Sequence, residues 1–386
     1  MHDVTPTSPA EVSRGDGKFR PPALGLRLSS RLLHATRGAC AWLADRESTL
    51  LGSALAEMPL REPIFIAGVA RSGSTLLLEA LASLPSVASA RYCDFPPVWF
   101  PYWWTRLREQ LPLPTPAPRM RAHGDGIKVT PLSPEACDEL LWMHFFPQRH
   151  DPTVDQRLAA TDQQARFDSF YARHIRKLLL ARGAQRYLCK GNYNLLRLPY
   201  LRRLFPDARF VVPIRSPASQ VQSLVRQHER FSRLSARWPS VGRQLALSGH
   251  FEFGPQRRAE CADVAEAVAI EAAFAAGDEV GGYARQWASS YGVLASWLEA
   301  DPELANQVLL LPHERLCADP AATLRQLGEH CRIGQGRLQN WLASWQHRIQ
   351  ARPELTLESL PLQTVEQHCG AVARRLGYGS ITGALA

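Results

Sequence analysis

Residues 63–81 read PIFIAGVARSGSTLLLEAL and predict a strand, a loop and a helix in direct succession. Residues 64–67 form a short apolar run, which is typical of a parallel strand buried on both faces. Residues 68–74 form a small-residue turn, and residues 75–84 carry leucines at helical spacing. Together they predict a phosphate cradle, because the first turn of a helix has unpaired N–H groups and the positive end of the helix dipole.

The cradle differs from the loop that binds nucleoside triphosphates. Gly68 and Gly73 have the spacing of that P-loop, but Ser74 stands where the P-loop has its phosphate-binding lysine. Arg71 supplies a positive charge inside the loop instead. A P-loop ATPase also needs an acid after a later strand to hold magnesium, whereas the best later strand here is followed by Arg215. We therefore expect a phosphate loop without a magnesium site.

Two segments in this order resemble the sulfotransferases that use 3′-phosphoadenosine 5′-phosphosulfate (PAPS). ARSGSTLL, residues 70–77, is similar to their 5′-phosphosulfate loop. FPDARFVVPIRSPASQVQSL, residues 205–224, is similar to their 3′-phosphate motif, in which an arginine ends a strand and a serine follows eight positions later. These are Arg215 and Ser223 here, after a strand at residues 209–214. The pattern most resembles the branch that includes protein-tyrosine sulfotransferases and bacterial relatives.

The resemblance implies an α/β fold of three layers, the P-loop-like sulfotransferase fold, in which helices flank a central parallel sheet. We expect residues 1–25 to be a disordered leader and residues 26–60 to form N-terminal helices. Residues 61–386 are expected to be the sulfotransferase domain, with a helical insertion at about residues 232–282.

The resemblance also implies how the donor is held. The 5′-phosphosulfate is expected on the residues of the loop, which are Arg71, Ser72, Gly73, Ser74 and Thr75. The 3′-phosphate is expected on Arg215 and Ser223. Lys190, which follows a short strand at residues 187–189, is expected to stabilise charge on the departing phosphate oxygen, and Arg71 is expected to share in catalysis.

A carboxylate shortly after the helix of the phosphosulfate loop acts as general base in the branch that this sequence resembles. An ungapped count places Tyr92 at this position, and Asp94 is the nearest carboxylate. We expect Asp94 to be the general base, because the aromatic residues around it would desolvate the carboxylate and raise its pKa. Glu79 and His123 are the alternative bases.

Further elements follow from local patterns. Ser133-Pro134-Glu135 reads as the start of a helix, so that Glu135, Asp138 and Glu139 are expected in its first turns, where acids complement the helix dipole. The remaining expected elements are helices at residues 26–55, 166–181, 195–204 and 282–298 and a buried strand at residues 308–311.

Composition limits the class of partner. A net charge of +9 favours anionic partners, yet the basic residues form no recognition-helix pattern, so we expect an anionic nucleotide rather than nucleic acid. No apolar run reaches membrane-spanning length. The eight cysteines lack CxxC spacing and the first 18 residues lack a secretory signal, which indicates reduced thiols and a cytoplasmic protein.

The sequence therefore predicts in-line sulfuryl transfer from PAPS to a hydroxyl or amine acceptor, without a metal. One alternative is a degenerate P-loop kinase or NTPase, which would use magnesium with Thr75 as a ligand. Another is a non-catalytic relative that binds the nucleotide without turnover. The patterns specify neither the acceptor nor the oligomeric state.

Overall fold

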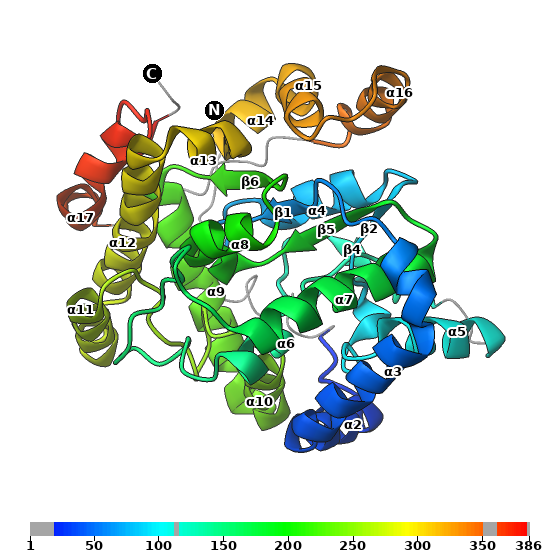
Figure 1. Ribbon diagram of the computed structural model, residues 1–386. Coiled ribbons are helices and arrows are strands. Elements are labelled where there is room, and N and C mark those ends of the chain that lie inside the picture. The colour runs from blue at the N-terminus through cyan, green and yellow to red at the C-terminus, as the bar shows by residue number, and fades with distance from the viewer. Residues whose placement is uncertain (1–18, 112–115, 350–360, 384–386) are drawn as a thin grey trace.

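A computed structural model describes residues 19–111, 116–349 and 361–383 (Figure 1). The leader expected at residues 1–25 therefore lies largely outside the described residues. One sheet of five parallel strands has the order β2-β5-β1-β6-β7. Its strands are β1 (Ile64–Ile66), β2 (Val87–Ala88), β5 (Arg186–Lys190), β6 (Arg209–Ile214) and β7 (Val308–Pro312). The short strands β3 (Arg119–Met120) and β4 (Lys128–Val129) form a separate antiparallel pair.

Helices cover both faces of the sheet (Figure 1). Those before β6 are α2 (Leu24–Ala35), α3 (Arg37–Glu57), α4 (Ser74–Ala82), α5 (Pro101–Gln110), α6 (Glu139–Phe145), α7 (Ala165–Arg182) and α8 (Leu198–Leu204), with the 3₁₀ helices η1 (Tyr92–Asp94) and η2 (Asn192–Arg197). Those after β6 are α9 (Pro217–Arg237), α10 (Pro239–Leu247), α11 (Val264–Ala275), α12 (Glu279–Ala300), α13 (Pro302–Gln307), α14 (His313–Ala318), α15 (Pro320–His330), α16 (Gln335–Trp345) and α17 (Leu362–Arg375).

Successive residues of the central strands enter two different cores, because side chains alternate between the faces of a sheet. Ile64 and Ile66 of β1 join the core under α4, α15 and α16. Phe65 between them joins the larger core under α7, α8 and α12 on the other face. Leu188 and Cys189 of β5 divide in the same way. The three-layer α/β fold with a central parallel sheet is thus confirmed.

The carboxyl ends of β1, β5 and β6 meet at one edge of the sheet. Ile66, the last residue of β1, pairs with Lys190 of β5 on one side and with Val211 of β6 on the other. The chain runs from β1 to strands on one side and then returns to strands on the other. Ligands of open α/β folds bind at this kind of reversal point, outside the carboxyl ends of the strands.

Pro213 is accommodated within β6 because the pairing of β1 with β6 ends at Ile66 and Val211. The Pro213 carbonyl accepts a hydrogen bond from the Tyr291 hydroxyl at 3.2 Å. Gly68 lies against the same carbonyl, and a Cβ at this position would be 2.7 Å from the Pro213 oxygen. The close approach of the two backbones therefore requires glycine at the start of the loop.

The expected elements agree with the structure except at two places. The helix expected at residues 166–181 is α7, and Gly183 ends it with a φ of 61°. The helix expected at residues 195–204 begins only at Leu198, because the 3₁₀ helix η2 occupies the preceding residues and Pro199 sits in the first turn, where proline is tolerated. The helix expected to start at Ser133 is absent there, as described below with the site.

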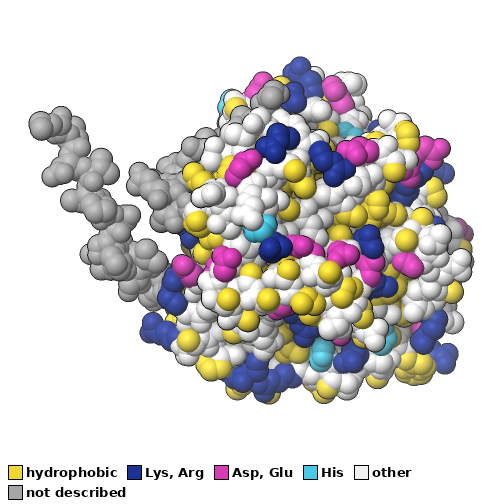
Figure 2. Space-filling view, turned by 90° about the vertical axis from the view of Figure 1, so that its left-hand side faces the viewer, with side chains coloured by type: hydrophobic (Ala, Val, Ile, Leu, Met, Phe, Trp, Pro, Cys, Tyr) yellow, Lys and Arg dark blue, Asp and Glu magenta, His cyan; other side chains and the backbone are white. Residues whose placement is uncertain are grey.

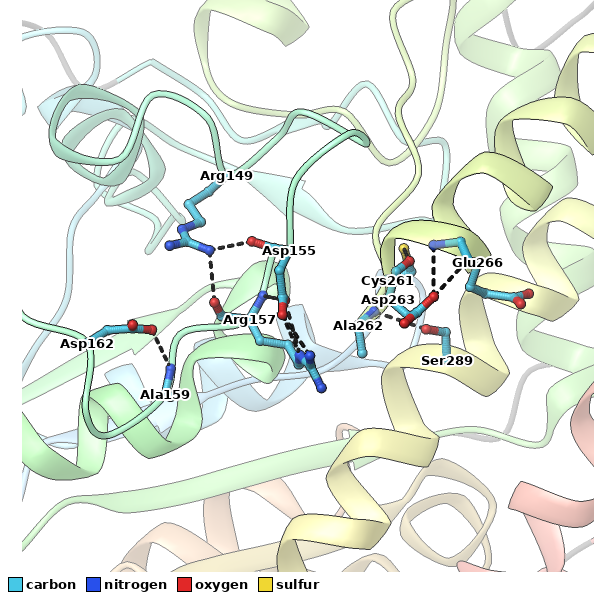
Figure 3. Close-up of polar contacts among 11 residues, drawn as sticks. Arg149, Asp155, Arg157, Ala159, Asp162, Cys261, Ala262, Asp263, Glu266 and Ser289 are labelled. Atoms are coloured by element: carbon cyan, nitrogen blue, oxygen red, sulfur yellow. Dashed lines mark hydrogen bonds and ion pairs between the residues drawn. The ribbon is translucent and has the colours of Figure 1, made fainter.

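The segment expected as a helical insertion contains α10, α11 and a long loop between them. Polar contacts fix the start of α11 and the loop before α7 (Figure 3). Asp263 accepts hydrogen bonds from the backbone N–H groups of Ala265 and Glu266 and so caps α11. Arg149 donates to the backbone carbonyls of Asp155 and Arg157.

The N-terminal helices pack beside the sheet domain (Figure 1). Glu47 of α3 and Lys177 of α7 form a buried ion pair at 2.8 Å. Ser30 of α2 accepts a hydrogen bond from Gln244 of α10 at 3.1 Å. Within the described parts of the chain, no helix combines the length and apolar character needed to cross a membrane. All eight cysteines lie in these parts and are free thiols.

Candidate active site

The loop between β1 and α4 has a backbone that the surrounding residues fix. Arg71 has a φ of 72°, in the left-handed region that side chains rarely adopt. Gly73 has a φ of 98°, and a Cβ there would lie 2.9 Å from the His313 ring. Helix α4 begins directly after Gly73. The loop therefore delivers the N–H groups of the first turn of α4 to the carboxyl edge of the sheet.

Gln220 of α9 binds the backbone of this loop through its side chain. Its side-chain amide donates to the carbonyls of Val69 and Ala70, each at 3.0 Å. Its side-chain oxygen accepts from the Trp287 indole at 3.0 Å. Gln220 is fully buried, so both of its polar groups are satisfied by this arrangement.

Cationic side chains converge on the first turn of α4. The Thr75 hydroxyl accepts hydrogen bonds from Arg121 at 3.2 Å and from Lys190 at 3.5 Å. Arg71 donates to the Ser223 hydroxyl of α9 at 3.1 Å and to Asp125 at 3.3 Å. The structure thus brings together Arg71, Thr75, Lys190 and Ser223, which come from four separate elements. We call this group, with Arg121 and Asp125, the cationic cluster.

Arg121 and Asp125 were not expected as a pair. The Arg121 Nε lies 2.9 Å from each Asp125 carboxylate oxygen, and the two side chains are each 7% exposed. Burial alone would raise the pKa of Asp125, but the hydrogen bonds and charge of Arg121 hold it well below its usual value. Asp125 therefore stays ionised and fixes the guanidinium of Arg121 beside Thr75.

Arg215 lies directly after β6, and its charge acts on Arg71 of the loop. Burial lowers the pKa of Arg71, and although Asp125 opposes this, the charges of Arg121 and Arg215 lower it further. Burial likewise lowers the pKa of Lys190. Positive charges at close range and partly removed from water are typical of a site that binds a multiply charged anion.

Asp94 lies outside the cationic cluster, contrary to the expectation that it is the general base. Both of its carboxylate oxygens are 2.7 Å from Arg182 of α7, and one accepts from the Arg91 backbone at 2.8 Å. The side chain is 6% exposed. Because its lone pairs are taken up by these donors, Asp94 ties η1 to α7 instead of facing an acceptor.

The segment after β4 pairs with the segment before η1. Glu135 N–H donates to the Ala90 carbonyl at 2.9 Å, and Tyr92 N–H donates to the Ser133 carbonyl at 3.1 Å. Pro134 forms an antiparallel bridge with Arg91. The helix expected to start at Ser133 is therefore wrong, because these backbone groups bond across to another segment; α6 begins only at Glu139.

The three acids expected in that first turn have three different environments. Glu139 accepts from Arg197 at 2.8 Å and lies 2.6 Å from His150; burial would raise its pKa, but these neighbours lower it to about 2. Asp138 accepts from the Tyr171 hydroxyl at 2.6 Å, and burial raises its pKa. Of the three, Glu135 is the one on which the charge of Lys190 acts.

Glu135 is a residue of the site that the sequence did not reveal. It accepts hydrogen bonds from the Tyr92 hydroxyl and, at 2.7 Å, from the Ala136 backbone. Burial would raise the pKa of Glu135, but the charge of Lys190 and the hydrogen bond from Tyr92 lower it below its usual value. The one sequence feature that pointed to this place was Tyr92, because an ungapped count puts it at the position of the family base.

The loop between α10 and α11 also reaches this part of the site. His250 and Glu252 lie 3.5 Å apart, and Asn192 after β5 donates to Glu252 at 2.6 Å. Burial would lower the pKa of His250, but the charges of Glu252 and Glu135 raise it. The segment expected as an insertion therefore contributes charged side chains beside Glu135.

The two alternative bases lie at the edges of the cationic cluster. Glu79 is one turn beyond Thr75 on α4; burial raises its pKa, which Arg121 opposes. The His123 ring packs against Phe231 and Phe253 with centroid distances of 5.3 and 5.6 Å. Burial lowers the pKa of His123 well below its usual value, and nearby arginines lower it further.

A cavity of about 310 Å³ lies between α2, α6, α10 and the residues that follow η1. Aromatic and basic side chains line it, among them Phe95, Trp99, Phe251, Arg37 and Arg258, and no acid is found among its described lining residues. Phe251 directly follows His250, so the cavity adjoins the loop that faces Glu135. Over the described ranges, no group of three or more His, Cys, Asp and Glu is placed to hold a metal ion.

Solved structures of two sulfotransferases are similar to this chain over most of its length. It is similar to a crystal structure of a sulfotransferase from Mycobacterium tuberculosis H37Rv, with 13% identity, a TM-score of 0.47, and coverage of 96% of this chain and 98% of that one. A sulfotransferase from Mycobacterium avium is also similar, with 14% identity, a TM-score of 0.43, and coverage of 84% and 79%. No curated protein matches the chain.

A sequence model of the sulfotransferase family matches residues 63–252. This segment runs from β1 to the loop after α10 and contains every residue of the cationic cluster as well as Arg215 and Glu135. Over residues 63–252 the chain is thus similar to the sulfotransferase family, as its two phosphate motifs predicted.

Proposed function

We propose that this protein transfers a sulfuryl group from PAPS to a hydroxyl or amine group of an acceptor by in-line displacement. The observation that carries this proposal is the cationic cluster. It joins the loop after β1, the end of β5 and helix α9 around one helix N-terminus, where both a dipole and side-chain charges favour an anion.

The donor would bind along the carboxyl edge of the sheet. Its 5′-phosphosulfate would lie on the loop, where the donors are backbone N–H groups, that of Gly73 among them, and the side chains of Arg71, Ser72, Ser74 and Thr75. Its 3′-phosphate would lie on Arg215 and Ser223. The 3.1 Å contact of Arg71 with Ser223 supports the closeness of the two phosphate sites. Hydrogen bonds to charged groups typically contribute about 1.5–3 kcal/mol each.

Lys190 would stabilise the phosphate oxygen that leaves sulfur. It is the last residue of β5, 9% exposed, and its ammonium lies beside Thr75 at the start of α4. Preorganised charge in a partly dehydrated site is worth more than in water, because little reorganisation is needed when charge develops. Arg71 would add a second positive charge to the transferring group.

The acceptor would enter from the cavity that Phe251 lines, next to His250 in the chain. Arg37 and Arg258 line this cavity together with Trp99 and Phe251. The Arg258 guanidinium lies 4.6 Å from the centre of the Phe251 ring. These side chains suit a hydroxyl-bearing molecule with an apolar body and an anionic group. Eight free thiols are consistent with a reducing compartment such as the cytoplasm.

The test is sulfuryl transfer from ³⁵S-labelled PAPS in EDTA, with 2-naphthol and water as acceptors. We expect the wild type to release 3′-phosphoadenosine 5′-phosphate (PAP) without added metal. Lys190→Ala should lower kcat by about 10²-fold or more, whereas Lys128→Ala, at an exposed lysine of β4, should keep wild-type rates. Folded Lys190→Ala and Arg71→Ala variants with wild-type rates would contradict the proposal. Turnover of ATP only with magnesium would favour the kinase or NTPase class instead.

A further inference from the structure

We propose that Glu135 is the general base that takes the proton from the acceptor. This inference rests on the proposed function and deepens it. It replaces Asp94 with a carboxylate that reaches the site from a different segment of the chain.

Backbone pairing places Glu135 at the position expected for the base. Residues 90–93 and 131–135 lie antiparallel, with hydrogen bonds from Glu135 to Ala90 and from Tyr92 to Ser133. Side chains two residues apart along such a pair share a face, so long side chains on a diagonal can meet. Tyr92 and Glu135 meet in this way, since the Tyr92 hydroxyl donates to the Glu135 carboxylate. The Glu135 carboxylate thus lies beside Tyr92, the residue that an ungapped count places at the position of the family base.

The Glu135 carboxylate is less tightly bound by cationic side chains than the neighbouring acids are. Asp94 is held through both oxygens by Arg182, and Glu139 is held by Arg197 and His150. Glu135 instead takes its hydrogen bonds from one hydroxyl and one backbone N–H, and Lys190 and His250 are among its charged neighbours. Neither donor encloses the carboxylate as a guanidinium does.

Position also separates Glu135 from the two alternative bases. Glu79 interacts with the charges of Arg121, Asp125 and Glu135, and Lys190 is not among the charges that act on it. His123 packs against two phenyl rings, and its charged neighbours include Arg121 and Arg71. A proton taken up by His123 would add a further positive charge beside these arginines, which is unfavourable.

The step balances with the groups present. The acceptor O–H bond breaks as its oxygen forms a bond to sulfur, and the proton passes to the Glu135 carboxylate. The bond between sulfur and the bridging phosphate oxygen breaks, and its electron pair stays on the 5′-phosphate of PAP, opposite Lys190. Glu135 then releases the proton to solvent. The products are a sulfated acceptor, PAP and one proton.

The experiment compares Glu135→Gln with Glu79→Gln and His123→Asn in the full chain. Single-turnover transfer from ³⁵S-labelled PAPS to 2-naphthol and to water gives the chemical rate, and calorimetry with PAP gives donor affinity. We expect Glu135→Gln to lower the transfer rate by about 10²–10⁴-fold and to change the Kd for PAP by no more than about threefold. Both control variants should stay within about tenfold of the wild-type rate. Glu135→Asp should recover part of the loss.

Each other result overturns the inference. A Glu135→Gln variant with the wild-type transfer rate shows that another group is the base, and a large loss in Glu79→Gln or His123→Asn alone identifies that group. Equal losses of PAP affinity and rate in Glu135→Gln would show a structural role. If the wild type binds PAP but transfers to neither acceptor, the proposed function fails together with the base. Transfer by the wild type with no effect of Glu135→Gln leaves the proposed function standing.

Discussion

Tyr92 and Glu135 show how one hydrogen bond would set the pH at which the site works. The Tyr92 hydroxyl stabilises the ionised form of Glu135, beside Lys190 and His250. Removing the hydroxyl should raise the pKa of Glu135. A base acts only when ionised, so the fall of kcat at acidic pH should begin at higher pH in Tyr92→Phe.

The expected displacement is roughly 0.4–1 pH unit, since a hydrogen bond contributes about 0.5–1.5 kcal/mol. It is measured from kcat between pH 4 and 8 with 2-naphthol. Tyr102→Phe on α5 is the control and should leave the profile unchanged. An unmoved profile in Tyr92→Phe, or one moved to lower pH, contradicts the assignment.

The sequence predicted some site residues because a local motif marks them. Arg71 and Thr75 belong to one loop-and-helix motif, Lys190 ends a recognisable strand, and Ser223 lies in the helix after another, so their meeting follows from the order of parallel strands. Glu135 could not be found in this way. Its place depends on pairing with residues 90–93, and Pro134 and the nearby acids favoured a helix start on local grounds alone.

The loop between β1 and α4 is the element whose shape matters most. An added Cβ at Gly68 would lie 2.7 Å from the Pro213 carbonyl. Gly68→Ala should therefore push the loop away from β6, destabilise the protein by about 1–3 kcal/mol, and weaken PAP binding. Urea unfolding measures the first effect and calorimetric titration with PAP the second.

Gly336→Ala is the matched control for this substitution. Gly336 lies within α16, and an added Cβ would have no neighbour within 4 Å. Alanine there should leave PAP binding unchanged and stabilise the protein by up to about 1 kcal/mol. If Gly68→Ala unfolds and binds PAP as the wild type does, the loop does not rest against β6 as described.

Elements were predictable where one pattern dominated the segment. The apolar strands and the amphipathic α7 with its terminal Gly183 follow from periodicity and a helix-ending glycine. The 3₁₀ helix η2 and the extended segment at Ser133 were not predictable, because short elements depend on partners that are distant in sequence. Gln220 likewise carries no motif, although it holds the phosphate loop.

The molecule as a whole carries a net charge of +9, yet basic and acidic side chains are interspersed on the face seen in Figure 2. The concentration of positive charge argued above lies instead at the carboxyl edge of the sheet. The fold class was predictable from the strand and loop motifs. The position of the loop between α10 and α11 at the site was not predictable, since only tertiary packing brings His250 beside Glu135.

Glu260 should make the stability of the whole molecule depend on pH. Its side chain is 1% exposed, and neither carboxylate oxygen has a hydrogen-bond partner among the described residues. Burial, with the charges of Glu252 and Glu139 and against that of Arg197, raises the pKa of Glu260 to about 8. The folded protein thus retains a proton that the unfolded chain loses above its ordinary carboxyl pKa.

Stability should fall as pH rises from the ordinary glutamate range to about 8, because the folded state binds more protons there. The contribution of Glu260 to this slope is at most about 1.4 kcal/mol per pH unit. Glu260→Gln resembles the protonated side chain and should flatten the slope in urea unfolding between pH 5 and 8. A variant with the same slope as the wild type would show that Glu260 does not titrate in this window.

We propose that the carboxyl edge of the sheet binds a nucleotide through its 3′-phosphate. Calorimetric titration with PAP and, separately, with ADP, both in EDTA, tests it most directly. We predict tight binding of PAP, much weaker binding of ADP, and loss of this preference in Arg215→Ala. Equal binding of the two nucleotides, or binding of neither, would show that this edge is not a site for a 3′-phosphate.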